Sequence, residues 1–286
     1  MANLVEETRN IMKKYGIRAN KDLGQNFLIN NEVVENIVNS SEISQDDMVI
    51  EIGPGLGTLT KYLLEKAGKV LCIELDRKMI EILEDRFEKY SNFEIINDDV
   101  LKVDLNKIIK ENKENEKIKN VKIVANLPYY ITTPIIMKLL EEKLDIESIT
   151  VMIQKEVADR LIEIPSGKNT GAITYTIYYY CVSEKIMEVP NSSFIPEPEV
   201  TSEVIKMKIR KEPVVKVENP KVMFMIIKSA FMQRRKTLLN ALTNAQVFIS
   251  KQEGIKILNK LGLNENVRAE NLTIENYADL AKEISK

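Results

Sequence analysis

The chain alternates continuous apolar runs with segments of helical periodicity, and this alternation constrains its fold more than any other feature. Five apolar runs have the length of a strand, at 48–52, 69–75, 93–99, 121–126 and 148–154. Segments of helical spacing follow them, at 58–67, 77–87, about 104–110, 133–142 and 155–163. Strands that are apolar throughout are typical of a parallel sheet with helices on both faces. We therefore predict an α/β fold.

Three further segments need separate interpretation. The stretch AITYTIYYYC at 172–181 is β-branched and aromatic, so its local propensity favours a strand. The runs at 185–190 and 203–210 are expected to form an antiparallel pair that closes the sheet. The stretch at 110–120 is highly charged and is typical of a loop.

The composition of the chain changes along its length. Residues 4–15 have helical spacing, and from Pro220 onward the pattern is entirely helical. The linker KEPVVKVENP separates this tail from the last predicted strand. We expect three parts: a basic arm with helices at 1–45, the sheet domain at 46–212 and a helical domain at 213–286.

Several classes of protein are excluded by composition. The chain has no histidine, which removes Ser-His-Asp and Cys-His catalysis and the commonest metal ligand, so we expect no metal site. No apolar run approaches 18 residues, so we expect no membrane-spanning segment. The N-terminus has acids but no apolar signal region, so we do not expect a signal peptide there. Cys72 and Cys181 lie in apolar surroundings without C-x-x-C spacing, which is typical of reduced thiols in a cytoplasmic protein.

The charge of the chain is unevenly distributed. The net charge is −2, which argues against a general nucleic-acid coat protein. However, residues 9–21 hold five basic residues and no acid, and residues 206–236 hold ten basic residues against two acids. These stretches are either solvated faces or binding surfaces for a polyanion.

A glycine loop follows the first strand of the sheet, as Glu51-Ile-Gly53-Pro54-Gly55-Leu-Gly57. Glycines let the backbone approach a ligand closely at the start of the next helix. The spacing is not the G-x-G-x-x-G of a dinucleotide site, and the acid at the loop would repel a pyrophosphate. The loop therefore favours a ligand that carries positive charge.

Acids end the next two strands. Glu74 stands about twenty residues beyond the glycines, where a carboxylate accepts both ribose hydroxyls, and Asp98 and Asp99 could accept an adenine amine. An adenosine-type ligand without phosphates fits this edge, so S-adenosylmethionine is favoured over a nicotinamide dinucleotide. We predict cofactor contacts from Gly53, Gly55, Glu74 and Asp99.

The fourth strand ends at Asn126-Leu127-Pro128-Tyr129 on the same edge. Pro128 fixes its own φ and makes Leu127 extended, so the tetrapeptide is a rigid hook that presents the Asn126 amide oxygen and backbone carbonyls. Two acceptors that hold the N–H groups of an exocyclic amine localise its lone pair for methyl transfer. The Tyr129 ring offers a face on which a base can stack.

The motifs together resemble one known family. The loop EIGPGLGTLT, the NLPY hook, Leu23–Leu28 (LGQNFL), Phe194–Ser202 (FIPEPEVTS) and Phe231–Leu238 (FMQRRKTL) are similar to the small-subunit ribosomal RNA adenine dimethyltransferases. The last two segments are much more specific than the first two. The similarity extends over essentially the whole chain. One departure is Tyr130, where many relatives carry asparagine.

The resemblance implies a fold, a reaction and site residues. The implied fold is a Rossmann-like methyltransferase fold with seven strands, the final one antiparallel, and with a helix at 172–181. The implied reaction is N6,N6-dimethylation of two adjacent adenines near the 3′ end of 16S ribosomal RNA. The implied cofactor contacts are Asn26, Leu28, Gly53, Glu74, Asp99 and Asn126. Asn126, Leu127, Pro128 and Tyr129 would hold the target adenine, with Phe194 on its other face.

The resemblance also implies partners and leaves alternatives. The substrate would be a partly assembled small ribosomal subunit, bound by a cytoplasmic monomer through phosphate contacts from Arg234, Arg235 and Lys236. One alternative is a large-subunit methyltransferase of the antibiotic-resistance type, although that family typically has Asn-Ile-Pro-Tyr and lacks the QRRKTL tail. The other is a non-catalytic assembly or transcription factor that keeps the fold.

Overall fold

The computed structural model describes residues 3–20, 23–115, 118–165, 167 and 169–285. Within these limits the chain forms two compact units. We call residues 1–158 and 183–209 the sheet unit, and residues 159–182 and 210–286 the helical unit. The three-part division expected from composition remains a prediction.

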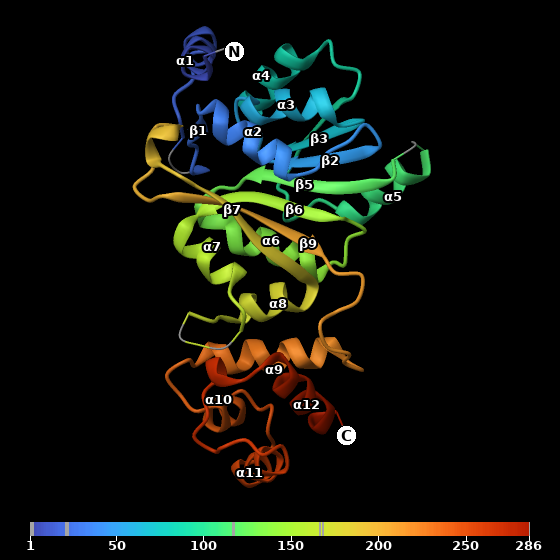
Figure 1. Ribbon diagram of the computed structural model, residues 1–286, viewed down its shortest axis with the longest axis vertical. Helices are drawn as coiled ribbons and strands as arrows, with labels where there is room; N and C mark the ends of the chain where they lie inside the picture. The colour runs from blue at the N-terminus through green and yellow to red at the C-terminus, as the bar shows by residue number, and fades with distance from the viewer. Residues whose placement is uncertain (1–2, 21–22, 116–117, 166, 168, 286) are drawn as a thin grey trace. The chain divides into compact units, whose positions relative to one another are not determined.

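The sheet unit is built on a seven-stranded sheet with the order β4-β3-β2-β5-β6-β9-β7 (Figure 1). The strands are β2 (Asp47–Ile52), β3 (Lys69–Glu74), β4 (Phe93–Asn97), β5 (Asn120–Asn126), β6 (Ser148–Gln154), β7 (Cys181–Val189) and β9 (Ser202–Ile209). The pairs from β4 to β6 are parallel, and β9 runs antiparallel to β6. The predicted mostly parallel sheet with an antiparallel final strand is confirmed.

The order of the strands reverses between β2 and β5. From β2 the chain adds β3 and β4 on one side, and then returns to place β5 on the other side of β2. In register, Glu51 lies opposite Cys72 on β3 and opposite Val124 on β5. The glycine loop after β2 therefore leaves the sheet beside Asn126, at the kind of point where open α/β sheets bind ligands.

Helices cover both faces of the sheet (Figure 1). One face carries α2 (Asn31–Ser40), α3 (Thr58–Lys66) and α4 (Arg77–Phe87), with α1 (Leu4–Lys14) beside them, and the other carries α5 (Leu105–Asn115) and α6 (Thr132–Glu141). Helix α7 (Lys155–Ile162) follows β6. Helix α5 continues to Asn115, so the loop predicted at 110–120 is wrong in its first half.

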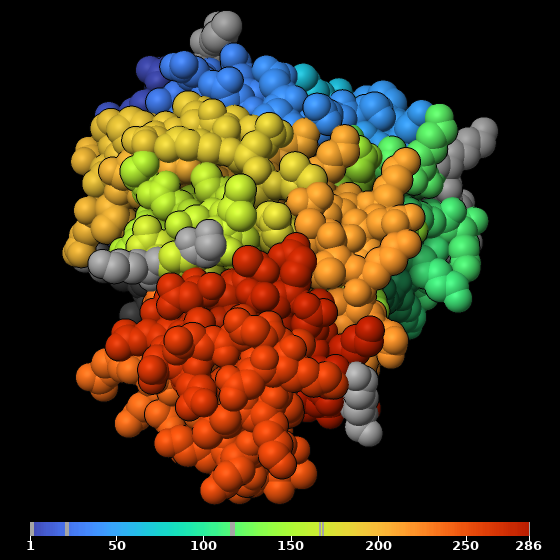
Figure 2. All heavy atoms as spheres, turned by 60° about the horizontal axis from the view of Figure 1, so that its bottom comes forward, coloured from blue at the N-terminus to red at the C-terminus, as the bar shows by residue number. Residues whose placement is uncertain are grey.

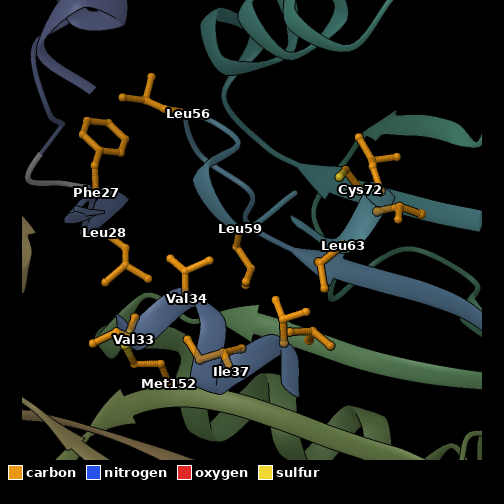
Figure 3. Close-up of a cluster of buried hydrophobic side chains, with 14 of the residues drawn as sticks. Phe27, Leu28, Val33, Val34, Ile37, Leu56, Leu59, Leu63, Cys72 and Met152 are labelled. Atoms are coloured by element: carbon orange, nitrogen blue, oxygen red, sulfur yellow. The ribbon is translucent and has the colours of Figure 1, made fainter. Parts of the chain in front are cut away.

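The face under α2 and α3 holds the main apolar core (Figure 3). Val34 and Ile37 of α2 and Leu63 of α3 are fully buried. Each of these residues lies three or four positions from other buried residues of the same helix, so each helix presents one buried stripe to the strands. Cys72 is part of this core as a free thiol.

The helical unit has its own core. It contains α8 (Ala172–Tyr180), α9 (Pro220–Met232), α10 (Leu238–Asn244), α11 (Lys251–Lys260) and α12 (Ile274–Ile284). Residues of α10 to α12, orange to red, form one continuous body in the space-filling view (Figure 2). The segment at 172–180 is a helix, as the family resemblance implied and against its local strand propensity. Within the described residues, no helix has the length and apolarity needed to cross a membrane.

Candidate active site at the carboxyl edge of the sheet

A cavity opens at the carboxyl ends of β2, β3, β4 and β5. Its wall is formed by the glycine loop, the acids that follow β3 and β4, the hook after β5 and the Leu23–Leu28 segment. The cavity is lined by twelve of the predicted residues or their neighbours: Asn26, Leu28, Glu51, Gly53, Gly55, Glu74, Asp98, Asp99, Asn126, Leu127, Pro128 and Tyr129. The structure therefore brings together every predicted cofactor residue and four of the five predicted catalytic residues.

The glycine loop has a backbone conformation that L side chains rarely adopt. Gly53, Gly55 and Gly57 have φ angles of 66°, 56° and 80°. A Cβ at Gly57 would lie 2.6 Å from the Phe87 ring, so this glycine lets the loop pack closely on α4. The Gly53 N–H donates to the Ile73 carbonyl at 3.0 Å and anchors the loop on β3.

Glu74 is held in place by backbone donors. Its Oε1 accepts hydrogen bonds from the N–H groups of Leu75 (2.8 Å) and Asp76 (2.9 Å), and its Oε2 accepts one from Gly55 N–H (3.3 Å). The side chain is largely buried, and this desolvation raises the pKa of the carboxyl although the backbone donors oppose the rise. The carboxylate is thus fixed at the cavity wall, and its contact with ribose hydroxyls stays a prediction.

Glu51 is a second buried acid at the cavity, only 2% exposed. The Cys72 thiol, opposite it on β3, donates to Glu51 Oε2 with an S···O distance of 3.5 Å. Burial raises the pKa of Glu51 to about 7, and the nearby Glu74 charge adds to the rise. Burial also raises the pKa of the Cys72 thiol well above its ordinary value, so the thiol stays a donor. A cation at this wall would favour the ionised form of Glu51.

Asp98 and Asp99 follow β4 and both line the cavity. Asp99 Oδ1 accepts from the Leu101 N–H at 3.0 Å, and Asp98 Oδ1 accepts from the Asp99 N–H at 2.7 Å. Each of these contacts fixes one carboxylate oxygen, and no described residue donates a hydrogen bond to the other oxygen. The contact of Asp99 with an adenine amine stays a prediction.

The hook after β5 is fixed from both sides. The Asn126 Nδ2 donates to the Asn26 carbonyl at 3.2 Å, and the Leu127 N–H donates to the Met152 carbonyl at 3.1 Å. The Pro128 carbonyl accepts from Ile131 N–H (3.2 Å) and from the Thr132 hydroxyl (3.1 Å). Because its Nδ2 is committed to Asn26, Asn126 has its Oδ1 oriented away from that contact.

Two acceptors of the hook remain for a ligand. Among the residues that the structure describes, none donates a hydrogen bond to Asn126 Oδ1 or to the Leu127 carbonyl. Both residues line the cavity, and the Leu127 side chain is only 1% exposed. The hook therefore offers the pair of acceptors that an exocyclic amine requires. The Pro128 carbonyl is not a member of this pair.

Tyr129 begins a 3₁₀ turn, Tyr129–Ile131, directly after the hook. Its hydroxyl lies 2.6 Å from the Ser202 hydroxyl at the start of β9, and Ser202 is fully buried. Partial burial raises the pKa of the Tyr129 phenol. Ser202 was not predicted to have a role, although it is the last residue of the segment FIPEPEVTS, and its position in that motif was the available signal.

The Leu23–Leu28 segment covers the glycine loop. A Cβ at Gly55 would lie 3.4 Å from the Phe27 ring, so this ring packs directly on the loop backbone. The Asn26 Nδ2 donates to the Gly24 carbonyl at 3.2 Å, which turns the segment toward the cavity. Gln25 Nε2 donates to Asp76 Oδ2 at 3.0 Å and ties the segment to the start of α4.

Phe194 is the predicted catalytic residue that does not line the cavity. It belongs to β8 (Phe194–Ile195), which pairs antiparallel with β1 (Phe27–Leu28), with Phe194 opposite Leu28. Its ring is 2% exposed and packs in the main core. Its role at the target adenine remains a prediction.

The predicted phosphate contacts lie in the turn after α9, in the helical unit. All three side chains are exposed, but they differ in what they contact. The Arg234 Nη2 donates to the Thr170 carbonyl at 3.1 Å, and its guanidinium lies 6.0 Å from the centre of the Phe231 ring. Arg235 and Lys236 make no side-chain contact of this kind with any described residue. Lys21, part of the N-terminal basic stretch, lies outside the described residues.

The donor set fits an adenosine cofactor with a cationic centre. The wall combines carboxylates, close glycine backbone and apolar side chains, and it presents no basic side chain among its described residues. A pyrophosphate would therefore meet acids rather than cations. In the described part of the chain, no group of three or more potential ligand side chains is placed to hold a metal ion.

Comparisons with known proteins all point to one family of ribosomal RNA methyltransferases. The model of the family described as ribosomal RNA adenine dimethylase matches residues 16–286. The "Ribosomal RNA small subunit methyltransferase A" of Alkaliphilus metalliredigens is 50% identical over 279 residues, covering 98% of this chain and 96% of that protein. The protein of the same name from Clostridium acetobutylicum is 47% identical over 277 residues, with coverages of 97% and 98%.

Solved structures give the same picture. A dimethyladenosine transferase from Plasmodium falciparum has a TM-score of 0.76 at 26% identity, covering 91% of this chain and 97% of that one. The 23S rRNA methyltransferase ErmE has a TM-score of 0.65 at 21% identity, with coverages of 91% and 100%. The second likeness shows a shared fold only.

Proposed function

We propose, from the premise that the chain belongs to the ribosomal RNA adenine dimethylase family, that it transfers methyl groups from S-adenosylmethionine to the N6 amines of adenines in ribosomal RNA. The observation that carries the proposal is the pair of acceptors on the hook, Asn126 Oδ1 and the Leu127 carbonyl, beside the glycine loop. S-adenosylmethionine supplies a methyl group that is already activated by its sulfonium. What remains for the protein is to bind, orient and polarise the amine.

The residues of the hook divide this task. Asn126 Oδ1 and the Leu127 carbonyl accept the two N–H groups of the amine, which makes the nitrogen pyramidal and localises its lone pair. These hydrogen bonds strengthen as positive charge develops on the nitrogen, so they stabilise the transition state more than the ground state. The Tyr129 ring stacks on the base and holds its plane.

The cofactor is held by the remaining wall. Glu74 would accept hydrogen bonds from the ribose hydroxyls and Asp99 from the adenine amine, and Gly53 and Gly55 would allow close approach of the methionine part; all four residues line the cavity. Asn26 and Leu28 belong to the segment that covers the glycine loop, and they would complete the contacts with the cofactor. Ionised Glu51 favours the sulfonium cation. No base is needed in this arrangement, because the amine proton leaves only after positive charge has formed on nitrogen.

The substrate is proposed more narrowly from the relatives. The curated relatives are named as methyltransferases of small-subunit ribosomal RNA, and the solved relative as a dimethyladenosine transferase. We infer that this chain dimethylates two adjacent adenines near the 3′ end of 16S RNA in a partly assembled small subunit. It does so as a cytoplasmic monomer that grips phosphates through Arg235 and Lys236, with Arg234 supporting the turn.

The test is transfer of labelled methyl groups to undermethylated small subunits, followed by digestion and identification of the modified nucleoside. N6,N6-dimethyladenosine in the small-subunit RNA is expected. Asn126→Ala should abolish transfer even when S-adenosylmethionine is present at a saturating concentration. Label in large-subunit RNA would instead identify the resistance-type alternative. Binding of small subunits without any transfer would identify the non-catalytic alternative.

A further inference from the structure

Tyr130 stands at the rim of the cavity with most of its ring in solvent. It is the central residue of the 3₁₀ turn Tyr129–Ile131, it lines the cavity, and it is 59% exposed. Among the described residues, its hydroxyl has no hydrogen-bond partner. An exposed phenol next to the residue that stacks on the target base needs a reason, since an aromatic side chain is favoured inside or at an interface.

The ring is held although it is exposed. A Cβ added at Gly24 would lie 3.4 Å from Cδ1 and 3.5 Å from Cε1 of the Tyr130 ring, so one edge of the ring packs on the Gly24 backbone. The same added Cβ would lie 3.5 Å from the Cβ of Pro128 in the hook. Gly24 itself has a φ of 62°, and its carbonyl is fixed by Asn26 Nδ2. The ring therefore loses little further freedom when a ligand stacks on it.

We propose that Tyr130 is a stacking platform for an unpaired RNA base adjacent to the target adenine. This inference rests on the proposed function, because it concerns the same cavity. When one base is turned out into the site, its neighbour in the RNA loses a stacking partner. A fixed aromatic face one residue from Tyr129 replaces that partner, and stacking is tolerant of base identity.

The other exposed apolar residue of the cavity fits this role less well. Leu75 is 52% exposed but follows Glu74, at the ribose end of the cofactor site, and it has no planar face. Tyr130 lies instead beside the acceptors of the hook. Of these two exposed residues, the one beside the hook carries an aromatic ring and the one beside Glu74 does not.

The experiment compares Tyr130→Ala, Tyr130→Leu, Tyr130→Phe and Tyr130→Trp. The dissociation constants of S-adenosylhomocysteine and of undermethylated small subunits are measured for each variant, and methyl transfer is measured in parallel. Tyr130→Ala and Tyr130→Leu should both weaken subunit binding by about 5- to 100-fold, the usual range for one lost base stack. Tyr130→Phe and Tyr130→Trp should restore subunit affinity, and cofactor affinity should be unchanged throughout.

Leucine is the decisive control, because it preserves apolar packing on Gly24 without a planar ring. If Tyr130→Leu binds subunits as well as wild type, the residue is only a packing element and the proposal is wrong. The same conclusion follows if Tyr130→Ala weakens the binding of S-adenosylhomocysteine rather than the binding of small subunits. Failure of the proposed function is recognised separately, because wild type would then transfer no label while its subunit affinity still reports on Tyr130.

Discussion

The hydroxyl of Tyr129 lies 2.6 Å from the hydroxyl of Ser202, which joins the hook after β5 to the first residue of β9. Tyr129 is partly buried and Ser202 is fully buried, so neither hydroxyl exchanges this partner for bulk water at low cost. The bond fixes the direction of the Tyr129 ring from a strand that follows it by 73 residues. Ser202 is therefore a positioning residue for the stacking face.

This bond predicts a non-additive pair of variants. Tyr129→Phe and Ser202→Ala should each lower kcat/KM for small subunits by roughly 3- to 10-fold, since a single neutral hydrogen bond contributes about 1 kcal/mol. The double variant should be no worse than the poorer single variant, because both changes remove one interaction. Steady-state kinetics with the four proteins measures this. Additive losses would show that the two hydroxyls act independently.

Glu51 predicts a pH dependence of stability. Burial raises the pKa of Glu51 to about 7, above its ordinary 4.5, so between these values the folded protein binds more protons than the unfolded chain. Stability then falls as pH rises, and the contribution that is complete below pH 4.5 is lost through pH 7. Its size is about 3 kcal/mol at 1.36 kcal/mol for each pKa unit.

The measurement is denaturant unfolding of wild type and Glu51→Gln from pH 5 to pH 8. The free energy of unfolding of wild type should decrease relative to that of Glu51→Gln across this range, because glutamine carries no titrating proton. Groups that do not interact with Glu51 contribute equally to both proteins and cancel in the difference. A difference that stays constant, or one that grows in favour of wild type at higher pH, would contradict the raised pKa of Glu51.

Glu74 predicts a loss of affinity shared by the cofactor and its product. Its carboxylate is fixed by the Gly55, Leu75 and Asp76 amides and faces the cavity. Glu74→Gln replaces one acceptor oxygen by a donor. Calorimetry should therefore show that the affinities for S-adenosylmethionine and S-adenosylhomocysteine both fall, by about 10- to 100-fold. Asn126→Ala is the matched comparison and should change transfer more than affinity. A loss of affinity for S-adenosylmethionine alone would place Glu74 at the sulfonium rather than at the ribose.

The three cations after α9 predict two different phenotypes. Arg235→Glu with Lys236→Glu should weaken binding to small subunits and reduce the salt dependence of log K by about 2, because two phosphate contacts are lost. Arg234→Ala should instead lower the free energy of unfolding by about 1 kcal/mol, because it removes the hydrogen bond to the Thr170 carbonyl. Salt titrations and thermal unfolding of the same variants separate these effects. An unchanged salt slope would make Arg235 and Lys236 part of a solvated face.

Much of the site could be predicted because its residues stand at strand ends. Parallel strands bring their carboxyl ends to one edge, so Gly53, Glu74, Asp99 and Asn126 could be placed together from the order of apolar runs alone. The pattern of apolar runs could not predict the hydrogen bonds that hold the site residues in place. The Tyr129–Ser202 bond joins residues far apart in the chain, and no periodicity encodes such a pair.

Two segments show where local signals mislead. Tyr175 and Tyr179 have strand propensity, but they lie four residues apart on one face of α8 and are buried in the helical core, so packing overrides propensity. The charged stretch at 110–120 begins as helix because Lys107 and Lys110 each lie within 3.9 Å of a glutamate one turn later. Charge alone did not distinguish a loop from an exposed helix.

The strand order also determines when the site is complete during synthesis. Strand β9 lies between β6 and β7, yet it is made after β7. Cys181–Val189 is therefore synthesised before Ser202–Ile209, the strand that lies beside it among the described residues. The Tyr129–Ser202 bond likewise requires that residue 202 has been added to the chain. A chain that ends before residue 202 has the glycine loop and the acids of the cofactor site, but it lacks the strand that aims the stacking ring at the target.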